Sequence, residues 1–197
     1  MNQTSLSTPR ILAFSGSARR DSFNQKLVHE AAQGAEQVGA EVTIVNLGDY
    51  PLPIMDEDLE REQGTPENAA KLKALFLAHD GLLIAAPEYN SSITPLLKNA
   101  IDWVSRPAEG EEPLAAYQGK TAALMSASPG GLGGLRGLTH LRSILGNIGV
   151  LVLPGQIAIS QAHEAFDAAG ILKDERKRSR VQEFGKTLAE TIAKLSA

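Results

Sequence analysis

Short apolar runs alternate with helix-patterned stretches along almost the whole chain of 197 residues, and this alternation limits the fold more than any other feature. The runs typical of buried strands are residues 11–14, 41–47, 81–86, 121–125 and 150–153, with 157–159 as a short extension of the last. Strands that alternate with helices predict a parallel sheet covered on both faces. We therefore expect an α/β fold.

Helices are expected where apolar residues recur at three- and four-residue spacing. The stretches concerned are 22–39, 65–79, a helix from Thr94 to about Ser105, 138–148 and 179–195. Ser22 with Gln25 has the pattern of a capping box, and Thr94-Pro95 has that of an N-cap followed by a first-turn proline. Residues 49–63, rich in Pro, Asp and Glu, and residues 108–115 are predicted to be surface loops. No repeat or linker is visible, so we expect one domain over 1–197 with a flexible N-terminus over 1–9.

Composition excludes several classes of function. The chain has no cysteine, which excludes disulfides, thiolate metal sites and cysteine nucleophiles. The formal net charge of −4 gives no basic excess for nucleic acid. The first nine residues lack the apolar core of a signal peptide, and the most apolar runs are too short to span a bilayer. We therefore expect a cytoplasmic protein that binds neither nucleic acid nor membrane.

The loop after the first strand, residues 15–24, joins a Gly/Ser turn to the start of a helix. A helix N-terminus offers free N–H groups and a partial positive charge, both suited to a phosphate. Ser17, Ser22 and Asn24 supply further donors, and Arg19 can add a charge-assisted hydrogen bond. The loop matches neither the P-loop nor the G-x-G-x-x-G pattern. A plain capped turn remains the alternative, but the number of donors favours phosphate binding.

Two more loops should lie at the same edge of the sheet, because they follow the third and fourth strands. The third strand is followed by a turn whose main chain suits a flat heteroaromatic ring, with Tyr89 beside the ring and Asn90 bonded to it. The loop 126–134 has four glycines in five positions, so a planar group can approach its backbone closely. A plain turn and a flexible loop are the simpler alternatives; three such loops at one edge favour a cofactor.

These motifs together resemble the NADPH-dependent FMN reductase family, the flavodoxin-like group that includes quinone, azo-dye and chromate reductases. The resemblance runs from about residue 10 to residue 155. The segments that carry it are Gly16-Ser17-x-Arg19-x-x-Ser22-x-Asn24, Pro87-Glu88-Tyr89-Asn90 and Pro95-Leu96-Leu97-Lys98-Asn99-Ala100-Ile101-Asp102-Trp103.

The resemblance implies a flavodoxin-like three-layer sandwich with strand order 2-1-3-4-5 and bound FMN. By position, the residues that would hold the FMN phosphate are Ser17, Arg19, Ser22 and Asn24. Those that would line the isoalloxazine ring are Pro87, Glu88, Tyr89 and Asn90, with Ser128 and Gly130 beside it. The family implies NADPH or NADH as the hydride donor, a ping-pong cycle with a small acceptor such as a quinone, and a homodimer or homotetramer.

The flavin carries the chemistry in this interpretation, so no catalytic side chain and no metal are expected. Arg20 and Arg106 are candidates for an NADPH phosphate, with an ordinary surface role at least equally open. His140 lies just after the glycine-rich loop and is singled out for that reason. The rival functions are a flavodoxin-type electron carrier and a non-catalytic FMN-binding module.

The helix after Thr94 also predicts how the chain assembles. Leu97, Ile101 and Val104 form a normal core stripe, while Leu96, Ala100 and Trp103 form a second apolar stripe about 100° away. A helix on one face of a sheet needs only the first stripe. We expect the second to form a homodimer interface; burial by the chain's own loops, such as 108–115, is the alternative.

Overall fold

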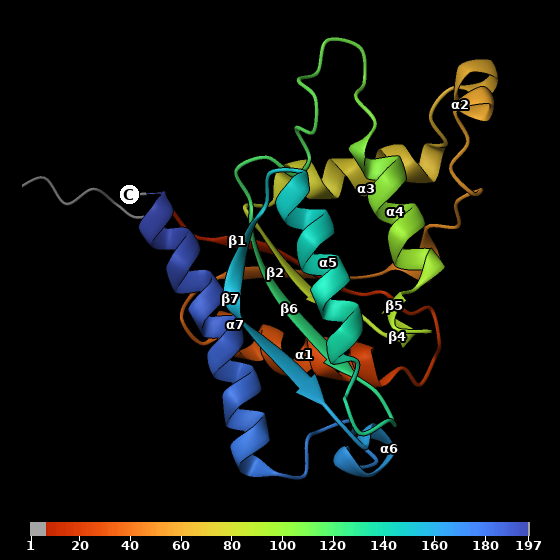
Figure 1. The fold of residues 1–197 in the computed structure, drawn as a ribbon. Coiled ribbons are helices and arrows are strands. Elements are labelled where there is room, and N and C mark those ends of the chain that lie inside the picture. Colours follow the sequence, from red (N-terminus) through yellow and green to blue (C-terminus); the bar gives the residue numbers. More distant parts are fainter. Residues whose placement is uncertain (1–6, 197) are drawn as a thin grey trace, which may run out of the picture.

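A computed structural model describes residues 7–196, and its centre is a sheet of five parallel strands. The strands are β1 (Arg10–Ser15), β2 (Glu41–Asn46), β3 (Gly81–Ala85), β6 (Thr121–Ala127) and β7 (Leu151–Ile159) (Figure 1). Their order is β2-β1-β3-β6-β7. Counted along the chain within this sheet, that is 2-1-3-4-5, so the predicted fold class and strand order are confirmed.

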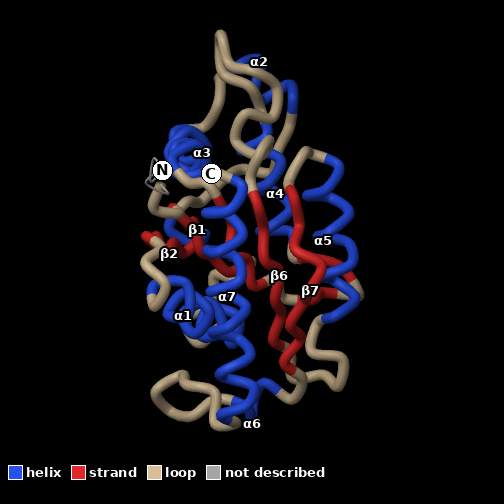
Figure 2. Tube along the Cα trace, turned by 90° about the vertical axis from the view of Figure 1, so that its left-hand side faces the viewer, coloured by secondary structure: helices blue, strands red, loops and turns tan. Residues whose placement is uncertain are grey.

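Helices cover both faces of the sheet because successive strand residues point to opposite sides. Ala13 and Leu83 pack with α1 (Phe23–Glu36) and α7 (Glu175–Leu195), whereas Leu12 and Leu82 pack with the other layer. That second layer comprises α3 (Glu67–Ala78), α4 (Pro95–Ser105) and α5 (Leu135–Asn147). In Figure 2, β6 and β7 lie between α7 and α5. The result is a three-layer sandwich with one apolar core on each side of the sheet.

The helices α1 and α7 cross at glycines. A Cβ atom at Gly34 would lie 1.9 Å from the carbonyl oxygen of Gln182, and one at Gly185 would lie 1.9 Å from that of Ala31. Glu30, buried on α1, accepts hydrogen bonds from Leu172 N and from the Gln182 side chain, both at 3.2 Å. The backbones of the two helices therefore touch, and a buried carboxylate fixes where they do so.

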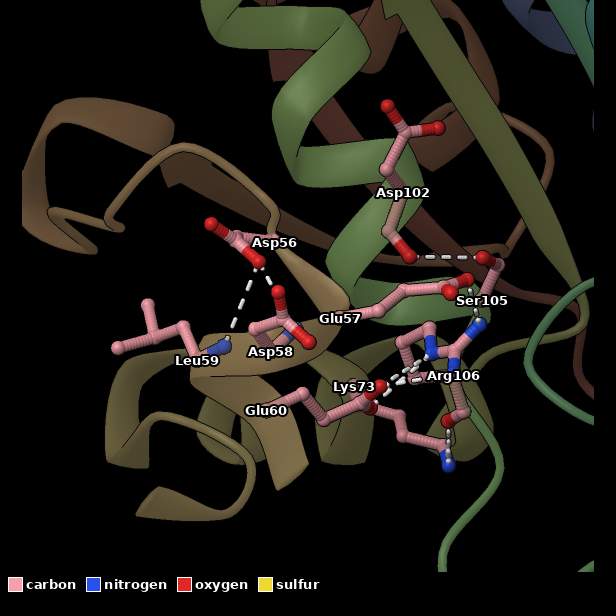
Figure 3. Close-up of polar contacts among 9 residues, drawn as sticks. All are labelled: Asp56, Glu57, Asp58, Leu59, Glu60, Lys73, Asp102, Ser105 and Arg106. Atoms are coloured by element: carbon pink, nitrogen blue, oxygen red, sulfur yellow. Dashed lines mark hydrogen bonds and ion pairs between the residues drawn. The ribbon is translucent and has the colours of Figure 1, made fainter. Parts of the chain in front are cut away.

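The surface loop predicted for residues 49–63 is wrong in part, because α2 (Glu57–Gln63) lies within it. Asp56 caps this helix by accepting a hydrogen bond from Asp58 N at 2.8 Å. Arg106, at the end of α4, donates from Nε to the Glu60 carboxylate at 2.8 Å (Figure 3). A helix of seven residues has too few apolar positions to show a helical period, so the pattern did not predict it. Its one sequence signal is the acidic first turn.

Other boundaries shifted by a few residues. The last helix begins at Glu175 rather than residue 179, because Asp174 caps it by accepting from Arg176 N (2.9 Å) and Lys177 N (3.1 Å). The runs 150–153 and 157–159 belong to one strand, β7, despite Pro154 in its middle. This is possible because β7 is an edge strand, where a missing N–H leaves no neighbour unpaired.

The expectation that the second stripe of α4 needs a partner is wrong. Trp103 is fully buried and Ala100 is 4% exposed within the single chain. Trp103 Nε1 and Asn99 Nδ2 each donate to the Pro53 carbonyl at 2.8 Å. The chain's own segment 51–55, rather than 108–115, covers this stripe and leaves only Leu96 half-buried.

Of the N-terminus expected to be flexible (1–9), residues 1–6 lie outside the described residues. At its end, the Pro9 carbonyl accepts a hydrogen bond from Glu41 N at 2.9 Å. In the part of the chain described by the structure, no helix has the length and apolar character needed to cross a membrane.

Candidate cofactor site

Three loops meet where β1, β3 and β6 end. Gly16 N donates to the Ala85 carbonyl at 2.9 Å, and Ala86 N donates to the Met125 carbonyl at 2.8 Å. Because the three strands are parallel neighbours, their carboxyl ends form one edge of the sheet, at which ligands of such folds bind. The three predicted loops are therefore brought together. We call them the first loop (16–22), the ring loop (87–93) and the glycine loop (128–134).

The first loop is arranged as an anion-binding site. Ser17 Oγ accepts from Arg19 N, and Ser22 Oγ accepts from Gln25 N at the start of α1, both at 3.3 Å. Each hydroxyl therefore still has its proton to donate. Within residues 7–196, the backbone N–H groups of Arg20, Asp21 and Ser22 have no hydrogen-bond acceptor in the protein. Hydroxyl and amide donors at a helix N-terminus suit a phosphate.

Arg19 is exposed, and in the described part of the chain its side chain forms no ion pair or hydrogen bond. Arg20 beside it is also exposed. Arg106 is different, because Glu60 binds its guanidinium group (2.7 Å to Nη2). In this structure Arg106 is bound to a carboxylate of α2 and is therefore not a free cation for an NADPH phosphate.

Asn24 is buried, and its amide group contacts the main chain of Ala127 rather than pointing away from the protein. Nδ2 donates to the Ala127 carbonyl at 2.8 Å and Oδ1 accepts from Ala127 N at 2.9 Å. This pair ties the start of α1 to the end of β6. Because both ends of the amide bind Ala127, Asn24 mainly holds the first loop beside the glycine loop. One hydrogen of Nδ2 remains for a ligand.

The ring loop is a hairpin rather than the turn predicted from the sequence. Its strands are β4 (Glu88–Tyr89) and β5 (Ser92–Ile93), joined by Asn90 and Ser91. Both joining residues have positive φ, 50° and 69°, the backbone of a type I′ turn. Tyr89 is 52% exposed and Asn90 is also exposed. Both side chains therefore face solvent, which defines the open side of this hairpin.

Thr94, the predicted N-cap of α4, links the ring loop to the first loop. Its hydroxyl accepts from Leu97 N at 3.2 Å and donates to the Gly16 carbonyl at 2.6 Å. The cap was predicted, but the bond to Gly16 was not, because 78 residues separate the two along the chain. The start of α4 and the turn after β1 are thus held at a fixed separation.

The side chain of Glu88 points away from the open side and into α5. Its carboxylate accepts from Arg136 N at 3.0 Å and Gly137 N at 3.2 Å, and it pairs with the Arg136 guanidinium group at 2.5 Å. Burial opposes ionisation of Glu88, but the hydrogen bonds from Arg136 and Gly137 outweigh it and hold the pKa of this carboxyl below its ordinary value. Arg136 could not be predicted as a partner of Glu88, because neither its residue type nor its spacing distinguishes it.

This lowered pKa predicts a pH dependence of stability. A carboxyl whose pKa is lower in the folded state stabilises the fold above its unfolded pKa of about 4.5, and that contribution is lost as the pH falls through the folded value. We expect Glu88→Gln to lower the free energy of unfolding at pH 7 by about 1 kcal/mol or more. The difference from wild type should shrink below pH about 4.5. Urea unfolding of both proteins between pH 7 and 3 measures it; a difference independent of pH would contradict the prediction.

The four glycines of the glycine loop do two different jobs. Gly133 and Gly134 have positive φ and are packed so closely that a Cβ atom would lie 2.8 Å from Ile159 C and 1.9 Å from Ser126 Oγ, respectively. Gly130 and Gly131 are exposed: a Cβ at Gly131 would meet nothing within 4 Å, and one at Gly130 only Ser128 Oγ at 3.7 Å. The first pair shapes the loop, and the second leaves bare backbone facing outward.

Ser128 and Gly130 are held by the last residue of β7 and by the chain that follows it. Ser128 N donates to the Ile159 carbonyl at 3.0 Å, and the Ser128 carbonyl accepts from Ala162 N at 3.1 Å. Ser128 Oγ accepts from Gly130 N at 3.3 Å. His140 lies on α5 beyond this loop, where Nδ1 contacts Ser92 Oγ at 3.0 Å. It supports the hairpin from α5.

The donor set fits FMN. One end of the site offers hydroxyls, free N–H groups and a free guanidinium group for a phosphate, and the other offers an exposed tyrosine and bare glycine backbone for a flat ring. Both ends lie along one edge of a doubly wound sheet, where flavodoxin-type proteins bind FMN. Fold and site together define a flavodoxin-like flavoprotein.

The chain belongs to the NADPH-dependent FMN reductase family, whose model matches residues 9–164. It is 37% identical over 175 residues to an NAD(P)H-dependent FMN reductase of Pseudomonas aeruginosa, covering 88% of this chain and 90% of that one. It is 34% identical over 176 residues to a 2-hydroxy-1,4-benzoquinone reductase of a Burkholderia species, covering 89% and 91%.

A solved structure agrees with these relatives. The flavoenzyme NAD(P)H:(acceptor) oxidoreductase FerB of Paracoccus denitrificans superposes with a TM-score of 0.79 at 30% identity, covering 96% of this chain and 100% of that one. The protein is accordingly an oxidoreductase with FMN as its cofactor and NAD(P)H as its electron donor.

Proposed function

We propose that the protein passes electrons from NAD(P)H through bound FMN to quinones or similar small acceptors, including free FMN, azo dyes and chromate. The observation that carries the proposal is the bare, outward-facing backbone of Gly130 and Gly131 beside a donor-rich first loop. It leaves one face of a flat ring open to small molecules. The quinone reductase among the relatives, at 34% identity, supports the choice of acceptor.

In this proposal the first loop anchors the cofactor. Ser17 and Ser22 donate their hydroxyl protons to the phosphate, Arg19 adds a charge-assisted hydrogen bond, and Asn24 keeps the loop against β6. Five residues flank the ring. Two of them, Pro87 and Asn90, do so with their main chain; the other three are Tyr89, Ser128 and Gly130. When bound, FMN supplies the chemistry, taking a hydride from NAD(P)H and giving electrons to the acceptor. The protein orients the ring and leaves one face open.

Steady-state oxidation of NADPH and NADH with a benzoquinone as acceptor tests this function. We expect turnover on purified protein with one FMN per chain. Because donor and acceptor would use the same open face, double-reciprocal plots at several quinone concentrations should be parallel. An electron carrier or a non-catalytic FMN-binding module would hold flavin yet oxidise NAD(P)H only when a separate reductase is added. Intersecting lines would instead indicate a ternary complex.

A homodimer is part of the proposal, on a surface adjacent to the one predicted from sequence. The segment 51–55 and the outer side of α4 form an open groove of about 410 Å³, mostly apolar, and Ile54 at its rim is 85% exposed. Together with the apolar lining of the groove, this side chain forms a contiguous exposed apolar patch, the kind that marks an interaction surface. Its lining residues are Leu52, Ile54, Met55, Pro95, Leu96, Lys98, Asn99 and Asp102. The groove begins at Pro95, two residues after the ring-loop hairpin, so a second copy bound there would form one side of the cofactor site.

We also propose a cytoplasmic location, because the electron donor NAD(P)H favours it.

Replacing Ile54 with glutamate should convert this dimer to a monomer, because a charge would be buried in an apolar contact. The mass from light scattering should fall by half while the circular dichroism spectrum stays unchanged. Leu195→Glu is the matched control, since Leu195 is 63% exposed at the end of α7, away from the groove. A dimeric Ile54→Glu variant would place the interface elsewhere.

A further inference from the structure

The hairpin of the ring loop has too few contacts of its own to hold a defined position. Its two strands pair over only two residue pairs, Glu88 with Ile93 and Tyr89 with Ser92. An isolated two-stranded hairpin is at best marginally stable in water, even when longer. Its turn also places Ser91, a residue with a Cβ atom, at φ 69°, which costs free energy that glycine would avoid. Something outside the hairpin must fix it.

Besides the bond from Thr94 to Gly16 just after the hairpin, two side chains of the hairpin attach it to α5 within residues 7–196. The carboxylate of Glu88, on β4, accepts hydrogen bonds from two backbone N–H groups in the first turn of α5 and binds Arg136. Ser92, on β5, contacts His140 one turn further along. The backbone also approaches closely there, since a Cβ at Gly137 would lie 3.1 Å from the Ser92 carbonyl oxygen. Each strand of the hairpin is thus fastened to the same helix.

Glu88 also supplies what α5 lacks. The residue before the helix is Gly134, which has no side chain to cap it, so the N–H groups of Arg136 and Gly137 depend on the carboxylate from the ring loop. The side chain of Glu88 is only 8% exposed and is occupied by these bonds. Because the glycine loop runs directly into α5, one carboxylate joins the two loops that flank the ring.

We propose that Glu88 is a positioning residue: its side chain sets the distance between the ring loop and the glycine loop by capping α5, and it does not itself contact the flavin. This inference rests on the proposed binding of FMN at the three loops. It differs from the role implied by the family resemblance, in which Glu88 lines the ring. On our view only the main chain of Glu88 faces the ring.

Two conservative variants separate reach from charge. Glu88→Gln keeps the length of the side chain and an oxygen that accepts from the α5 amides, but has no charge. Glu88→Asp keeps the charge, but it is one methylene shorter and cannot reach those amides without moving the hairpin. A positioning role predicts that Gln holds FMN within about threefold of wild type and that Asp loses about tenfold or more. A direct electrostatic contact with the flavin predicts the reverse order.

The experiment titrates flavin-free protein with FMN, follows the quenching of FMN fluorescence, and records the visible circular dichroism of the bound flavin. Asp56→Ala is the control, since Asp56 caps α2 through two amides in the same way, away from the three loops. It should leave the FMN dissociation constant within about twofold while lowering the melting temperature of the flavin-free protein. The dichroic band should change for Glu88→Asp and not for Glu88→Gln.

The inference is supported if the Gln variant binds FMN more tightly than the Asp variant and if the visible dichroic band changes in the Asp variant alone. Equal losses, no loss in either, or a larger loss in the Gln variant would overturn it. If the Asp variant does not fold, the Gln variant decides alone, because a tenfold or greater loss would show that the charge acts on FMN directly. Wild-type protein that failed to bind FMN would overturn the proposed function, and this inference with it.

Discussion

Replacing Gly185 with alanine is expected to destabilise the protein by about 3 kcal/mol, the upper end of the cost of overpacking a core. Gly185 lies inside α7, where alanine would ordinarily stabilise by up to about 1 kcal/mol. Here the added Cβ would lie 1.9 Å from the Ala31 carbonyl oxygen of α1. Backbone atoms cannot rotate away as a side chain can, so the helices must separate. That separation also strains the bonds from Glu30 to Leu172 and Gln182.

Gly146 provides the control, because it is also a helical glycine, but a Cβ there would meet nothing within 4 Å. Gly146→Ala should leave the free energy of unfolding unchanged or raise it by up to about 1 kcal/mol. Urea unfolding of the two variants and wild type, with flavin removed, measures the contrast. Equal stability of the Gly185 and Gly146 variants would mean that the helices tolerate a wider crossing than the structure has.

The sheet could be predicted from the sequence because it depends on local patterns. Buried parallel strands are continuous apolar runs, and each run from 11–14 to 150–153 became a strand of the sheet. What the sequence could not give were features set by distant partners. Trp103 looked like an interface residue, since nothing in its helix reveals that the Pro53 carbonyl accepts a hydrogen bond from its indole. The short α2 depends in the same way on Arg106, 46 residues further along the chain.

The same contrast between local patterns and distant partners holds for the cofactor site. The loops could be predicted, because Gly, Ser, Pro and Asn at strand ends carry their own conformational signal. The direction of each side chain could not. Asn24 and Glu88 stand at motif positions that suggest contact with the flavin, yet one binds Ala127 and the other caps α5. A motif therefore identifies which residues build a site; only the packing shows whether they contact the ligand or hold the residues that do.

Removing the side chain of Arg19 is expected to weaken FMN binding strongly and to leave the stability of the fold almost unchanged. Its guanidinium group is exposed and unpaired within the described residues, so its removal takes no contact from the protein. A charge-assisted hydrogen bond to a phosphate contributes about 1.5–3 kcal/mol. Arg19→Ala should therefore weaken FMN binding by roughly 10- to 150-fold, with the melting temperature of the flavin-free protein unchanged.

Arg20→Ala is the matched comparison, since Arg20 is the next residue, equally exposed and of the same charge. If Arg19 acts through a specific bond, only its variant should lose affinity, and the loss should persist at high salt. If the first loop attracts the phosphate only by its general positive charge, both variants should weaken binding by a similar, smaller factor that vanishes as salt screens it. FMN titrations in low and high salt separate the two cases. An Arg19→Ala variant with wild-type affinity in both would mean that the phosphate does not bind beside Arg19.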